Sequence, residues 1–123
     1  MLDLLTPTDH AGAYEWASVF LAHMAIGLGL VALVSAALDW VTGDWIDGTG
    51  EVAALIVTVV YLVAWEGFVQ RYGAGLMDAA ADTLAVASGG LLGLFLWRRA
   101  GVKAAGVLAL AGLALWRGVR GRR

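Results

Sequence analysis

The sequence predicts an all-α membrane protein, and two observations carry that prediction. First, 61% of the 123 residues are hydrophobic and 15% are charged, whereas a soluble domain has about 45 to 50% apolar and about 25% charged residues. Second, the apolar residues gather in four long runs separated by charged or glycine-containing stretches. We therefore expect one membrane domain of four transmembrane helices, near residues 15–39, 52–72, 76–97 and 101–117. The composition excludes a water-soluble enzyme and a nucleic-acid-binding module.

The charged residues are sorted along the chain. All ten acidic residues lie between Asp3 and Asp82, and all eight basic residues lie between Arg71 and Arg123. This asymmetry indicates a membrane with two different faces. The first fifteen residues lack the positive region of a secretory signal, so the first apolar run is expected to stay in the mature protein. The absence of cysteine excludes disulfides and thiolate metal sites, and no cofactor is predicted.

The helix at 15–39 has the clearest pattern. Residues 16–38 contain no Asp, Glu, Lys or Arg and would rise about 34 Å, enough for a hydrocarbon core of about 30 Å. Trp16 and Trp40 flank this run, as in the aromatic belts at lipid headgroups. The next segment, 39–51, is predicted as an acidic loop with four carboxylates. Calcium binding is the alternative, but the spacing does not fit an EF-hand loop.

The second and third helices reach spanning length only by including polar residues. The uncharged runs 52–65 and 83–97 would rise only about 21 to 23 Å each. Extension to 52–72 brings in Glu66 and Gln70, and extension to 76–97 brings in Asp78 and Asp82. Glycines at 73 and 75 suit a tight turn between the two helices.

The fourth helix, 101–117, is short, and its crossing depends on its ends. Lys103 and Arg117 flank an apolar run and can extend it by snorkelling. Three spans plus a re-entrant or interfacial C-terminal helix is the alternative.

Residues 117–123 form a basic tail that anchors to anionic lipid, with no nucleic-acid role expected. Four spans put both termini on one side, and the basic residues favour the cytoplasm by only five to three.

A candidate polar pocket arises where polar residues of three helices reach one depth. His23, Glu66 and Asp82 each lie six or seven residues from the membrane side that carries the 72–75 turn, about 10 Å deep by helical rise. Gln70 and Asp78 are each four residues from one of these acids and share its helix face. Arg71 is predicted to be the nearest cation for Asp78. Ionisable residues at membrane depth are a functional-site hypothesis by default.

Three alternatives to this pocket stay open. Residues 66–82 can be an interfacial connection whose charges lie in water, and His23 can bond to a neighbouring helix. One histidine with carboxylates can also hold a divalent metal, but no fixed spacing supports this, and no metal is predicted. Gly89 and Gly93 form a GxxxG pattern that allows a close approach between helices.

The residues from Trp65 to Arg71, followed by Asp78, Asp82 and the segment 89–93 with the sequence Gly-Gly-Leu-Leu-Gly, resemble the core of VanZ-like and YjdF-like small integral membrane proteins. The resemblance implies functional importance for Glu66, Gln70, Asp78 and Asp82, and more loosely for His23. Asp82 stands where the VanZ-like pattern prefers Asn, and Ala85 stands where that pattern has Gly. These families imply no agreed reaction, although the VanZ-like group is associated with glycopeptide tolerance at the cell envelope.

Three functions follow as hypotheses. The first is a small bacterial inner-membrane protein whose polar pocket binds a lipid-linked or headgroup-like ligand or relays protons. The second is a phage holin that oligomerises into a lesion, and the third is an accessory subunit of a larger membrane assembly. The expected partners are membrane lipids and either further copies of the chain or a larger membrane protein. The sequence does not decide whether the chain is an enzyme.

Overall fold

The computed structural model describes residues 12–43, 48–72 and 75–122, and in these ranges every regular element is helical. The elements are α1 (Ala13–Thr42), α2 (Thr49–Val60), the π-helix η2 (Tyr61–Val69), α3 (Leu76–Trp97) and α4 (Gly101–Arg120). Four helical segments, with α2 and η2 forming one of them, are long and apolar enough to cross a membrane. The predicted class, an all-α multi-pass membrane protein, is confirmed.

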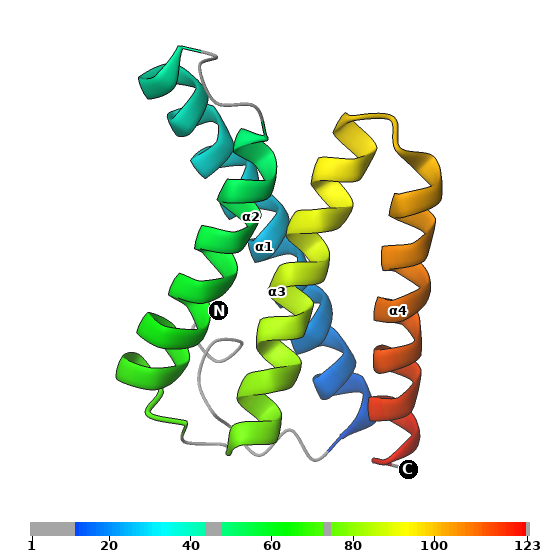
Figure 1. The fold of residues 1–123 in the computed structure, drawn as a ribbon. Helices are drawn as coiled ribbons and strands as arrows, with labels where there is room; N and C mark the ends of the chain where they lie inside the picture. The colour runs from blue at the N-terminus through cyan, green and yellow to red at the C-terminus, as the bar shows by residue number, and fades with distance from the viewer. Residues whose placement is uncertain (1–11, 44–47, 73–74, 123) are drawn as a thin grey trace.

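The helical segments run in alternating directions (Figure 1). The end of α1, the start of α2 and the turn between α3 and α4 therefore lie at one end of the bundle. The start of α1, the turn after η2 and the end of α4 lie at the other end, which we call the hairpin end. The ring of Trp16 in α1 covers Gly118 of α4 at this end.

Glycines bring the backbones of α1 and α3 into contact. A Cβ atom at Gly27 would overlap the carbonyl of Val86, and one at Gly89 would overlap the carbonyl of Met24. Gly93 lies against the side chain of Leu28. Such close approach is the usual role of small residues between membrane helices. It holds the middle of α1 against α3 and so fixes how the polar side chains of these two helices meet.

The connections are shorter than the sequence predicted. The acidic loop 39–51 is wrong at both ends, because α1 continues to Thr42 and α2 begins at Thr49. Gly43 ends α1 in the left-handed conformation, a common glycine stop, and Glu51 lies in the first turn of α2, where the helix dipole favours an acid. Asp44 and Asp47 lie outside the described residues.

The basic tail 117–123 is likewise mostly helical. Helix α4 includes Arg117 and Arg120 in its last turn, where positive charge is favourable. The guanidinium of Arg120 also lies over the ring of Trp116, 5.2 Å from its centroid. Arg123 lies outside the described residues.

The largest departure from the predicted α-helix 52–72 is the π-helical segment η2. Its i to i−5 hydrogen bonding is seen where the Gln70 amide donates to the Trp65 carbonyl at 2.8 Å. Residues five apart point about 140° away from each other in an α-helix, but they share a face in a π-helix. Tyr61 and Glu66, five residues apart, are therefore both buried.

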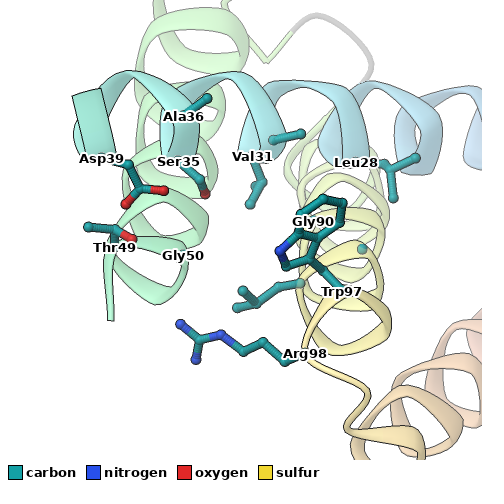
Figure 2. A pocket seen from close by; sticks show the side chains of 13 residues that line it. Leu28, Val31, Ser35, Ala36, Asp39, Thr49, Gly50, Gly90, Trp97 and Arg98 are labelled. Atoms are coloured by element: carbon teal, nitrogen blue, oxygen red, sulfur yellow. The ribbon is translucent and has the colours of Figure 1, made fainter. Parts of the chain in front are cut away.

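The end opposite the hairpin end carries a groove between α1, α2 and α3. Its volume is about 510 Å³, and its wall runs from Leu28 to Asp39 along α1. Figure 2 shows Ser35 and Asp39 of α1 across from Trp97, the last residue of α3, and Arg98, which follows it. We call this feature the interfacial groove.

Candidate functional site

Four buried polar residues from three helical segments gather towards the hairpin end. His23 of α1 is 2% exposed, Tyr61 and Glu66 of η2 are 7% and 4% exposed, and Asp82 of α3 is 9% exposed. We call these four residues the polar cluster. Their burial inside one chain separates them from lipid as well as from bulk water.

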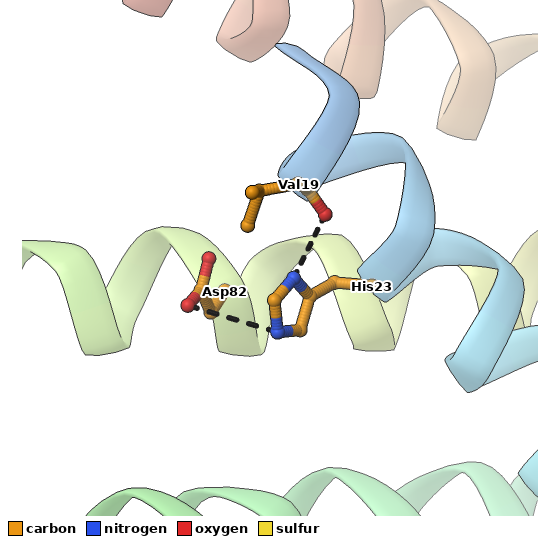
Figure 3. Close-up of polar contacts among 3 residues, drawn as sticks. All are labelled: Val19, His23 and Asp82. Carbon is orange, nitrogen blue, oxygen red and sulfur yellow. Dashed lines mark hydrogen bonds and ion pairs between the residues drawn. The ribbon is translucent and has the colours of Figure 1, made fainter. Parts of the chain in front are cut away.

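The centre of the polar cluster is a contact between a histidine and an acid (Figure 3). Nδ1 of His23 lies 2.8 Å from the Val19 carbonyl oxygen, and Nε2 lies 3.8 Å from Oδ2 of Asp82. A carbonyl oxygen can only accept a hydrogen bond, so Nδ1 donates. Nε2 is therefore the imidazole atom that can gain or lose a proton facing the Asp82 carboxyl group.

This geometry allows one proton to be shared between His23 and Asp82. A neutral imidazole beside a protonated acid contains as many protons as an imidazolium beside a carboxylate. The 3.8 Å between Nε2 and Oδ2 is longer than a direct hydrogen bond. Transfer therefore requires a small approach of the two groups or one bridging water.

Tyr61 and Glu66 complete the cluster. The rings of Tyr61 and His23 meet edge to face with centroids 5.8 Å apart, and the phenol interacts electrostatically with Glu66 and Asp82. The Tyr61 hydroxyl and the Glu66 carboxyl group interact with each other, but within the described residues neither Tyr61 Oη nor Glu66 Oε1 has a partner at full hydrogen-bond distance. Buried polar atoms of this kind are costly, so both oxygens are available to a proton, a water or a ligand.

The remaining predicted site residues lie nearer the hairpin end. Asp78 is half-buried in the first turn of α3 and interacts electrostatically with Glu66 and Asp82. Gln70, directly after η2, is also half-buried. Arg71 is exposed in a left-handed turn, and the ion pairs of the described residues do not join it to Asp78. Burial therefore increases from the hairpin end inwards, from Asp78 to Asp82 and His23.

Tyr61 is the cluster member that sequence reasoning missed. It stands in a Val-rich run and, on an α-helix, would not share a face with Glu66. The one available signal is an aromatic hydroxyl five residues before an acid, and this becomes informative only if a π-helix is considered.

Within the described residues, no three His, Asp or Glu side chains gather closely enough to hold a metal ion, so the metal alternative gains no support.

Family models, curated proteins and solved structures give no match to this chain. The VanZ-like resemblance stays a prediction that rests on the residues around the hairpin. The functional argument therefore depends on the chemistry of the polar cluster.

Proposed function

We propose that this chain is a small multi-pass membrane protein that relays protons from the hairpin end to the buried imidazole of His23, and back, through the polar cluster. The observation that carries the proposal is the buried His23–Asp82 contact beside Tyr61 and Glu66, whose side chains interact with each other. Ionisable groups inside membranes are rare, and they often belong to proton relays.

The order of burial gives the relay a direction. Asp78 is half-buried nearest the hairpin end, Glu66 and Asp82 are buried, and His23 is the most buried of the set. Asp78 and Asp82 are one helical turn apart, about 6 Å along α3. A proton entering at Asp78 would reach Asp82 and then Nε2 of His23.

A second candidate uses the same cluster as a binding site for a lipid-linked or headgroup-like ligand. The Tyr61 hydroxyl and the Glu66 carboxylate favour it, because neither has a partner at full hydrogen-bond distance within the described residues and a bound polar group would satisfy both atoms. A bacterial inner membrane is the proposed location for either activity. Membership in a VanZ-like family is part of the same proposal.

The holin hypothesis has less support. Glu66 and Asp82 are enclosed within a single chain, whereas a pore between copies would use acids on an outer helix face. Expression in a bacterium separates the two functions. The relay predicts growth without sudden lysis, and abrupt lysis at a fixed time would favour the holin.

A hydrophobic carbodiimide tests the relay, because it enters lipid and reacts with protonated carboxyl groups. In native membranes we expect a mass-spectrometric adduct on Glu66 or Asp82. The matched control is Asp39, an exposed acid at the opposite end of the bundle, which should react instead with a water-soluble carbodiimide. Glu66→Gln and Asp82→Asn should each reduce labelling by the hydrophobic reagent. Labelling that spares both acids would contradict the relay.

A further inference from the structure

The interfacial groove has the features of a site for one membrane lipid, and it lies away from the polar cluster. Its inner part is apolar, with Leu28 and Val31 on α1 and Gly90 on α3. Its outer part carries Ser35 and Asp39. A groove that changes from apolar to charged along its length matches a molecule with a hydrocarbon end and a polar end.

The length of the groove matches one leaflet of the bilayer. Leu28 and Asp39 mark its extent along α1, and eleven residues of helix rise about 16 Å. Half of a hydrocarbon core of about 30 Å is about 15 Å. The groove thus reaches from the headgroup level to the middle of the bilayer, the depth of one acyl chain. Its volume of about 510 Å³ is in the range of small-molecule sites.

The charges at the mouth specify the headgroup. Asp39 and Arg98 stand on different helices with their charged ends on the same side of the groove, away from Leu28 (Figure 2). Arg98 forms an ion pair with Glu51 through Nη1, and a guanidinium has five N–H donors, so donors remain for a phosphate. Asp39 and Glu51 stand at this end with Arg98, and Lys103 is close enough to Glu51 to act on it electrostatically. The mouth therefore carries charges of both signs, which favours a headgroup that contains both an anion and a cation.

We propose that the interfacial groove binds a zwitterionic glycerophospholipid with a primary ammonium group, its phosphate at Arg98 and its ammonium at Asp39. The hydroxyls of Ser35 and Thr49, which line the same mouth, add hydrogen-bonding capacity. A primary ammonium donates hydrogen bonds to a carboxylate, whereas a quaternary ammonium has no N–H. This difference separates phosphatidylethanolamine from phosphatidylcholine.

Native mass spectrometry of the full chain, released from detergent in the presence of lipids with matched acyl chains, tests the site. We expect a one-lipid adduct that prefers phosphatidylethanolamine over phosphatidylglycerol by about tenfold, the effect of roughly one hydrogen bond to a charged group. Asp39→Asn should remove most of this preference. Equal retention of phosphatidylethanolamine, phosphatidylglycerol and phosphatidylcholine by the wild type would overturn the proposal.

Two matched variants locate the lipid. Ser35 points into the groove (Figure 2), so Ser35→Phe should fill it and reduce the one-lipid adduct by about tenfold or more. Ala37→Phe adds the same ring at an exposed position of α1 outside the groove and should leave the adduct unchanged. Equal adducts in the two variants would overturn the assignment. Circular dichroism of both variants checks that the bundle is intact.

Discussion

At the scale of single residues, the tautomer of His23 determines what the polar cluster can do. Nδ1 is committed to the Val19 carbonyl at 2.8 Å, and this leaves Nε2 for Asp82 at 3.8 Å. The opposite tautomer would point a fixed N–H at the acid and would not allow a neutral imidazole to accept a proton from Asp82. The backbone of α1 thus orients the proton-carrying atom.

The first prediction concerns this tautomer. Neutral His23 should carry its hydrogen on Nδ1, because a carbonyl can only accept a hydrogen bond. Two-bond proton–nitrogen correlation spectra of the imidazole would measure it in detergent. The chain has two histidines, so His10→Gln identifies the signal. A hydrogen on Nε2 of neutral His23 would contradict the proposed relay geometry.

The second prediction concerns Tyr61. Tyr61→Phe keeps the ring against His23 and removes a buried hydroxyl that interacts with Glu66 but has no partner at full hydrogen-bond distance within the described residues. Because an unsatisfied buried hydroxyl costs about 1 to 3 kcal/mol, the variant should be as stable as the wild type or more stable by about 1 kcal/mol. Denaturation in mixed micelles measures this, with exposed Tyr14→Phe as the control. A loss above 2 kcal/mol would mean that the hydroxyl has a stabilising partner.

Three members of the polar cluster could be predicted from sequence by counting helical depth. His23, Glu66 and Asp82 lie six or seven residues from the same membrane side, and each is buried in the structure. Arg71 shows the limit of this reasoning, because its exposure depends on a left-handed turn that spacing alone does not reveal.

At the scale of elements, the π-helix and the α1–α3 contact position the cluster. The helix 76–97 was placed at its observed bounds because glycines precede it and arginines follow it. The π-helix could not be predicted, because hydrophobic periodicity assumes 3.6 residues per turn. Burial of both Tyr61 and Glu66 fits only the wider turn. The predicted ends of α1 and α4 lie too early in the chain, because charged residues in a sequence favour a loop, although helix ends accept them.

The third prediction tests the α1–α3 contact. Gly89→Ala should destabilise the bundle by about 1 to 3 kcal/mol, the usual cost of overpacking, because the new methyl group would overlap the Met24 carbonyl. Gly106→Ala is the control, since open space surrounds Gly106 on α4; it should be neutral or stabilising by up to about 1 kcal/mol. Denaturation in mixed micelles measures both. Equal stability of the two variants would contradict the close contact.

At the scale of the whole molecule, the alternating helices fix which segments share a membrane side. The start of α1 and the end of α4 lie at the hairpin end, and the α3–α4 turn lies at the opposite end (Figure 1). The polar cluster and the interfacial groove therefore belong to opposite leaflets. The proposed proton site and the proposed lipid site thus lie towards opposite ends of the bundle.

The fourth prediction tests this topology. Single cysteines can be introduced without background because the chain has none. Tyr14→Cys and Gly121→Cys should react with an impermeant thiol reagent from one side of the membrane, and Gly101→Cys from the other. All three positions are exposed. Reaction of Gly101→Cys and Gly121→Cys from the same side would exclude a fourth crossing.

The central claim is that the buried acids of the polar cluster take up and release protons, and infrared difference spectroscopy between two pH values tests it most directly. The wild type should show carboxylic C=O bands that exchange slowly with deuterium, as expected of buried groups. Glu66→Gln and Asp82→Asn should each remove one such band, whereas Asp39→Asn should remove only a rapidly exchanging one. A double variant of Glu66 and Asp82 with the same slowly exchanging bands as the wild type would contradict the account.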